Sequence, residues 1–144
     1  MKNLPLSLRF IFCFCVLGFF FSGYLSVVKL FSGVCALNET CPTFLRLPAC
    51  WFGFALFAAL LTLAVFALTR RVPFSRAIVL LGGVSFVGVL FASYLTMIEL
   101  PAFLRLGFKA YTLGVPNCFL GLVFFMLVFV TAALAWSHDR DLNN

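Results

Sequence analysis

Two cysteines of this chain occur in the same short pattern. Residues 48–53 read Pro-Ala-Cys-Trp-Phe-Gly and residues 116–121 read Pro-Asn-Cys-Phe-Leu-Gly, so proline, cysteine and glycine recur 68 residues apart. Proline suits the first turn of a helix, where its missing N–H is not needed. A cysteine beside it lies at the helix N-terminus, whose dipole favours the reactive thiolate. The pattern predicts Cys50 and Cys118 as candidate catalytic thiols; inert or disulfide-bonded cysteines are the alternative.

The glycine of each pattern follows its cysteine by three residues. Positions three apart share one face of a helix. Glycine there lets a second backbone approach closely, as in many packed membrane helices. We therefore expect Gly53 and Gly121 at helix–helix contacts.

The composition places these cysteines in a membrane protein. The chain of 144 residues is 65% apolar and only 10% charged, whereas soluble domains are about a quarter charged. Four apolar runs reach the roughly 20 residues that cross a bilayer core, and only helices satisfy the backbone of such runs in lipid. The runs are Leu8–Phe31, Cys50–Thr69, Ala77–Ile98 and Pro116–Trp136. The predicted fold is all-α, a four-transmembrane-helix bundle that forms one integral membrane domain, residues 1–144, with the lipid bilayer as its partner.

The basic residues predict the orientation, because short cytoplasmic segments are rich in Lys and Arg. They gather before the first helix and between the second and third: Lys2, Arg9, Arg70, Arg71 and Arg76. The protein is expected in a plasma membrane or a bacterial inner membrane. Both termini, including a short solvated tail over 137–144, are expected on the cytoplasmic side. The net charge of +6 is interpreted as a membrane-facing girdle, and the chain lacks the basic cluster that a nucleic-acid partner requires.

The two cysteine patterns belong to a longer internal repeat. FSGYLSVVKL from Phe21 aligns with FASYLTMIEL from Phe91 at an offset of 70 residues. The chain therefore reads as two tandem helical hairpins, over about 8–69 and about 77–136. An even number of crossings gives both copies the same orientation, so a pseudo-two-fold axis near the membrane normal is expected.

The repeat also aligns two opposite charges, Lys29 and Glu99, near the ends of the first and third helices. In a pseudo-symmetric bundle they could face each other and pair. The preferred interpretation is that both reach water, as long side chains near helix ends do. On that interpretation no span carries a buried charge, and a transport function is disfavoured.

Four cysteines are expected on the extracytoplasmic side: Cys35, Cys41, Cys50 and Cys118. Oxidising conditions there allow disulfides, and four cysteines permit three pairings. One of them, Cys35–Cys41 with Cys50–Cys118, would close a short loop and tie the two hairpins together. A zinc site is disfavoured and no metal is predicted, because no histidine is near and the Cys35–Cys41 spacing is not a usual ligand spacing.

With these features the chain resembles the vitamin K epoxide reductase family and the bacterial DsbB proteins, which are four-helix membrane thiol oxidoreductases. GVSFVGVLFASYLTMIEL followed by LGVPNCFLGLVFF is similar to the last two helices of that fold. The departure lies in the Cys-x-x-Cys motif, of which Cys118 and Cys50 each supply only the second cysteine. A redox cycle would therefore need these two cysteines to act as partners, or Cys41 to react with one of them.

The resemblance implies a quinone-linked thiol–disulfide oxidoreductase. A secreted or periplasmic thiol protein would react at Cys35 and Cys41, and electrons would pass to Cys50 and Cys118 and then to a quinone. The repeat-matched polar residues Tyr24, Tyr94, Ser26 and Thr96 are candidate quinone contacts, although Tyr at an interface and Ser/Thr within helices are also ordinary. The alternative function is a non-catalytic membrane scaffold or complex subunit with structural disulfides.

Overall fold

The computed structural model describes residues 6–32, 43–44, 47–106 and 117–143. Four helices account for most of them: α1 (Leu6–Ser32), α2 (Ala49–Leu68), α3 (Phe74–Leu106) and α4 (Asn117–Asn143). All four are long and apolar enough to cross a membrane, which confirms the predicted all-α, four-helix fold. A two-residue antiparallel pairing, β1 (Thr43–Phe44) with β2 (Leu47–Pro48), precedes α2.

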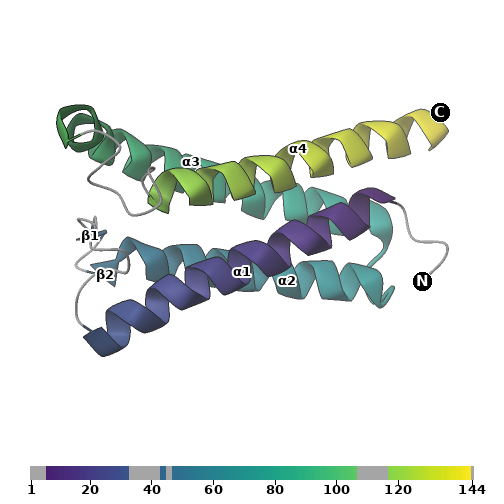
Figure 1. Ribbon diagram of the computed structural model, residues 1–144. Helices are drawn as coiled ribbons and strands as arrows, with labels where there is room; N and C mark the ends of the chain where they lie inside the picture. Colours follow the sequence, from purple (N-terminus) through teal and green to yellow (C-terminus); the bar gives the residue numbers. More distant parts are fainter. Residues whose placement is uncertain (1–5, 33–42, 45–46, 107–116, 144) are drawn as a thin grey trace.

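The helices form two antiparallel hairpins that pack as two layers (Figure 1). The α1–α2 hairpin lies against the α3–α4 hairpin through contacts of α2 with α3 and of α1 with α4, so α2 and α4 lie on a diagonal. The start of α1, the end of α4 and the α2–α3 turn lie at one end of the bundle. The other end holds β1, β2 and the starts of α2 and α4, and is named the cysteine end here.

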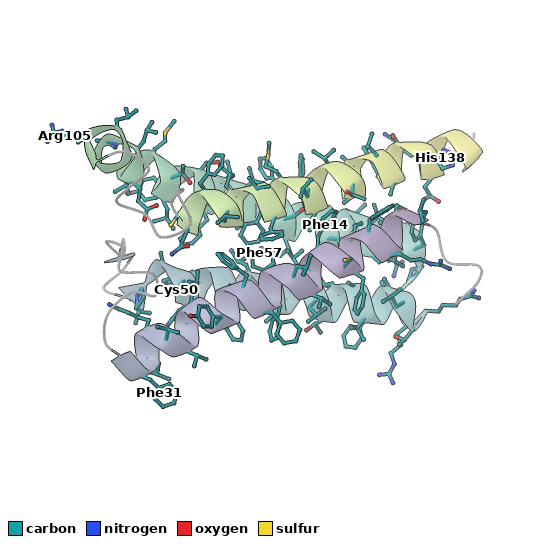
Figure 2. The ribbon with its side chains drawn as sticks, in the orientation of Figure 1. Phe14, Phe31, Cys50, Phe57, Arg105 and His138 are labelled. Atoms are coloured by element: carbon teal, nitrogen blue, oxygen red, sulfur yellow. The ribbon has the colours of Figure 1, made fainter. Side chains whose placement is uncertain are left out.

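Large apolar side chains cover the outside of the bundle. Phe20 is 69% exposed and Phe31 85% exposed, and Figure 2 shows Phe31 directed away from the other helices. Such a surface would be unstable in water, whereas lipid solvates it. The protein is therefore an integral membrane protein whose apolar surface meets the bilayer.

The two hairpins bury residues at the same positions of their helices. In α1 the buried residues are Leu8, Ile11, Cys15, Gly18, Ser22 and Leu25, and in α3 the residues 70 positions later are buried too: Ile78, Leu81, Ser85, Gly88, Ala92 and Leu95. In α2 and α4 the matching sets, 68 positions apart, are Phe57, Leu60, Ala64 and Ala67 with Phe125, Val128, Ala132 and Ala135. Spacings of three and four residues put each set on one helical stripe. The inward stripes therefore agree at the two offsets of the predicted repeat.

A tight turn joins the hairpins. α2 ends at Leu68, and Arg70 has a positive φ of 56°. The Arg70 N–H donates to the Ala67 carbonyl and the Arg71 N–H donates to the Phe66 carbonyl, at 3.2 and 3.0 Å. These two bonds form a Schellman motif, which satisfies the last carbonyl groups of a helix.

Two helices are longer than the apolar runs predicted. α3 continues through Pro101 to Leu106, and the final segment turns away from the helix axis, so that it appears nearly end-on in Figure 1. Proline removes one backbone hydrogen bond and crowds the preceding turn, which accounts for a bend there. The expected solvated tail over 137–144 is helical as far as Asn143, as part of α4.

Candidate functional site

The local sequence places both candidate cysteines at helix starts. Pro48 caps α2 with φ −60° and ψ 133°, and Cys50 is the second residue of that helix. Cys118 is likewise the second residue of α4, which begins at Asn117. Both cysteines therefore lie in the first turn of a helix, where the backbone N–H groups have no partner within the helix. Pro116, which precedes α4 in the repeated pattern, lies outside the described residues.

Cys50 is half-buried between α1 and α2 at the cysteine end (Figure 2). The single hydroxyl proton of Ser26, on α1, is shared between the Ser22 carbonyl oxygen at 2.8 Å and the Cys50 carbonyl oxygen at 3.2 Å. Ser26 is therefore a polar contact between α1 and the start of α2, next to this thiol. Lys29 follows Ser26 by three residues, about one helical turn nearer the cysteine end.

Cys118, like Cys50, is neither fully buried nor fully exposed. Both residues are thiols, and no disulfide joins the cysteines that the structure describes. Asn117, beside Cys118, has a fully buried side-chain oxygen. Cys35 and Cys41, the remaining candidate catalytic residues, lie outside the described residues.

Glu99 is buried, in contrast to the expectation from the sequence. Its side chain is only 6% exposed. The reason is periodicity, because Glu99 continues the inward stripe of Gly88, Ala92 and Leu95 at spacings of three and four residues. The interpretation of Glu99 as a solvated residue is therefore wrong, as is the statement that no span carries a buried charge. The stripe spacing was the signal that could have revealed it.

The four candidate quinone contacts fall into two groups. Tyr24 and Tyr94 are 58% and 55% exposed on the outside of α1 and α3. Ser26 and Thr96 are half-buried on other faces of the same helices, and the Thr96 hydroxyl donates to the Ala92 carbonyl at 2.8 Å. The structure brings Ser26 to Cys50 and leaves both tyrosines on the surface of the bundle.

The expectation that Gly53 and Gly121 mark helix contacts is wrong. A Cβ atom added to either glycine would meet no described atom within 4 Å. Phenyl rings next to Gly53 span the distance to both neighbouring helices: Phe52 reaches Phe91 and Phe54 reaches Phe19, with centroids 5.7 and 4.9 Å apart. These rings keep the backbones apart at that level.

The close contacts belong instead to Gly18 and Gly88. A Cβ on Gly18 would lie 2.7 Å from Cζ of Phe57, and a Cβ on Gly88 would lie 2.7 Å from Cγ of Phe125, with other ring atoms closer still. Figure 2 shows Phe57 between the two hairpins. The sequence carried a signal for these glycines, because Gly18 and Gly88 are 70 residues apart and obey the offset of the repeat, but they are not among the predicted contacts.

Within the described residues, no group of three or more His, Cys, Asp or Glu side chains is arranged to hold a metal ion. Comparisons of the chain with protein-family models, with characterised proteins and with solved structures find no match. Function is therefore inferred from the types and the placement of the residues themselves.

Proposed function

We propose that the protein is a quinone-linked thiol–disulfide oxidoreductase of the membrane, similar to the vitamin K epoxide reductase family. The observation that carries the proposal is the placement of Cys50 and Cys118, each a half-buried thiol at the second position of a helix at the cysteine end. A helix N-terminus stabilises a thiolate, which is the reactive form of cysteine. Partial burial limits the access of water to the reacting sulfurs.

The proposed chemistry is a two-electron exchange. Cys50 and Cys118 form a sulfur–sulfur bond, and the two electrons and two protons that they lose convert a quinone to a hydroquinone. Thiols of a secreted protein then reduce the new disulfide by exchange through Cys35 and Cys41, and become a disulfide themselves. A Cys50–Cys118 bond requires their Cα atoms to lie within about 7 Å of each other. The proposal therefore requires the starts of α2 and α4 to come that close when the bond forms.

The packed centre of the bundle restricts where a quinone can act. Phe57 and Phe125 follow their cysteines by seven residues, which is about two helical turns. Because these rings fill the space between the hairpins, a quinone that accepts electrons from the sulfurs would bind between the rings and the cysteine end. Ser26 offers a half-buried hydroxyl at that level, and the exposed Tyr24 would meet a quinone arriving from lipid.

Oxidation by a soluble quinone tests the proposal. The purified full chain, with Cys35 and Cys41 replaced by serine, is reduced, freed of reductant and mixed with the quinone before its thiols are counted. We expect two thiols per chain to be lost, and none to be lost once Cys50→Ser or Cys118→Ser is added. Cys13→Ser, at an exposed position within α1, is the matched control and should behave like its parent.

The opposite result would favour the second function. If the reduced protein keeps its thiols under quinone, and the Cys50→Ser, Cys118→Ser double variant is indistinguishable from its parent, the redox proposal fails. The cysteines would then be structural, in a membrane scaffold or complex subunit. The well-packed Phe57–Phe125 contact is compatible with such a rigid scaffold.

A further inference from the structure

The end of the bundle opposite the cysteine end, named the basic end here, carries an excess of positive charge (Figure 1). Five arginines and two aspartates of the described residues lie there: Arg9, Arg70, Arg71, Arg76, Arg140, Asp139 and Asp141. Three of these arginines fall within seven residues of one another, in the turn between α2 and α3 and in the first turn of α3. Arg70, Arg71 and Arg76 are all exposed, and within the described part of the chain their side chains make no ion pair. These three residues are named the arginine patch.

The backbone at Arg70 is not one that favours arginine. In the Schellman motif that ends α2, Arg70 has a left-handed φ of 56°. Glycine is the usual residue at that position, because a Cβ atom is disfavoured in the left-handed conformation. The chain therefore places a guanidinium group at this turn against the local conformational preference, and such an outlier is a reason to assign a function to the side chain.

The register of α3 against α4 places the arginine patch at the depth of the lipid headgroups. A Cβ atom added to Gly82 would lie 3.9 Å from Cβ of Ala132. Because the two helices are antiparallel, Ile78 and Trp136 are level with each other, about one turn nearer the basic end. Trp136 is 42% exposed, and exposed tryptophans of membrane helices gather at the headgroup level. Arg76, two residues before Ile78, therefore lies at that level or just beyond it.

Apolar side chains continue from the arginine patch toward the middle of the membrane. Val79 and Leu80 follow Arg76 at spacings of three and four residues, which puts them on the same face of α3. They are 55% and 48% exposed. Phe66, four residues before Arg70 and close to the end of α2, is exposed as well. Cations at the interface above apolar, lipid-facing side chains match a molecule with an anionic head and hydrocarbon tails.

We propose that the arginine patch binds the headgroup phosphate of an anionic phospholipid in the leaflet on its side of the membrane, with the acyl chains against Val79 and Leu80. Guanidinium groups bind phosphate oxygens through two parallel hydrogen bonds. Each cation near an anionic membrane surface increases the affinity about fivefold. The exposed apolar side chains next to the patch select a lipid over a soluble phosphate. This binding is independent of the thiol chemistry and can be measured with every cysteine replaced by serine.

Thermal unfolding of the full chain in detergent micelles tests the proposal, because a lipid that binds the folded protein raises its Tm. Phosphatidylglycerol should raise the Tm more than phosphatidylcholine with the same acyl chains, which has no net charge. The Arg70→Gln, Arg71→Gln, Arg76→Gln triple variant should lose this difference. Each single variant should need about fivefold more phosphatidylglycerol for the same rise. Arg105→Gln removes an exposed arginine at the cysteine end (Figure 2) and, as the matched control, should behave like its parent.

Arg70→Gly separates lipid binding from support of the fold. In micelles without anionic lipid this change should raise the Tm by about 2–4 °C, because glycine accepts a positive φ without strain. Its response to phosphatidylglycerol should nevertheless be weakened as much as that of Arg70→Gln. A lower Tm without lipid, together with an unchanged response to phosphatidylglycerol, would contradict the proposal and show that Arg70 supports the turn itself.

Three further outcomes would overturn the proposal. Phosphatidylcholine could raise the Tm as much as phosphatidylglycerol does, or the triple variant could respond like its parent. Glycerol phosphate, which carries the charged head without the acyl chains, could replace the lipid at the same concentration, and the patch would then be a site for soluble phosphates. The first comparison uses the unchanged protein, so it decides even if the triple variant fails to fold.

Discussion

The rings of Phe57 and Phe125 stack face to face between the diagonal helices α2 and α4, with centroids 4.2 Å apart and planes 11° apart. Each ring also lies against a glycine of its own hairpin, Gly18 or Gly88. The order glycine, ring, ring, glycine therefore runs across the middle of the bundle. Lipid provides no hydrophobic force between helices, so close packing of this kind must hold the hairpins together.

The glycine contacts predict a sharp contrast among glycine substitutions. Gly18→Ala and Gly88→Ala force a methyl group into a phenyl ring, and such overpacking costs about 1–3 kcal/mol. Gly53→Ala and Gly121→Ala meet no described atom and should be neutral or slightly stabilising, because alanine favours helix. Thermal unfolding in detergent measures the difference. Equal losses at all four positions would show that the contacts do not support the fold.

Removing a ring from the stack should be costly. Phe57→Ala or Phe125→Ala leaves a cavity, and changes of this kind in packed cores cost about 3–5 kcal/mol. Phe20→Ala is the control, because that ring is 69% exposed and faces lipid. The double variant should cost less than the sum of the single ones, since either change already removes the ring–ring contact. Strict additivity in denaturant unfolding would contradict a direct stack.

The Ser26 hydroxyl links α1 to the start of α2, so its removal should weaken the cysteine end. Ser26→Ala should cost about 0.5–1.5 kcal/mol, the net value of a typical hydrogen bond. Thr62→Ala loses only an exposed bond within its own helix, to the Ala58 carbonyl at 2.7 Å, and should change the unfolding free energy little. Faster amide hydrogen exchange near Cys50 in Ser26→Ala alone would localise the effect.

The topology can be tested with a membrane-impermeant maleimide. Ser75→Cys in a cysteine-free protein places a thiol at the exposed start of α3, beside the basic turn, and should react only after the membrane is permeabilised. A protein that retains only Cys41 should react in intact cells or spheroplasts. The reverse pattern would place the termini and the Arg70–Arg76 turn outside the cell.

The four helices could be predicted because twenty apolar residues in a row have one stable conformation in lipid. The helix starts at Cys50 and Cys118 could also be predicted, from the prolines before them. The ends of α3 and α4 could not, because beyond the apolar core a helix ends where capping and interfacial contacts end it, and Pro101 bends α3 without ending it.

The helix contacts were harder to predict than the helices. Gly53 and Gly121 follow their cysteines at the same spacing, but whether a glycine meets another helix depends on the side chains around it. Next to Gly53, the rings of Phe52 and Phe54 hold the neighbouring helices away. The distance of Glu99 from the helix end does not determine whether it reaches water. Glu99 points inward because it lies on the same stripe of the helix as the buried residues Leu95 and Ala92.

The aromatic stack also has an electrical consequence. The proposed quinone chemistry would move protons near one membrane surface, and the transmembrane potential acts on each charge with about 2.3 kcal/mol per 100 mV. Two phenyl rings wedged between glycine backbones offer no hydrogen-bond partners to a file of water molecules. Phe57 and Phe125 therefore place an apolar layer, without hydrogen-bonding groups, between the start of α2 and the basic turn at the opposite end.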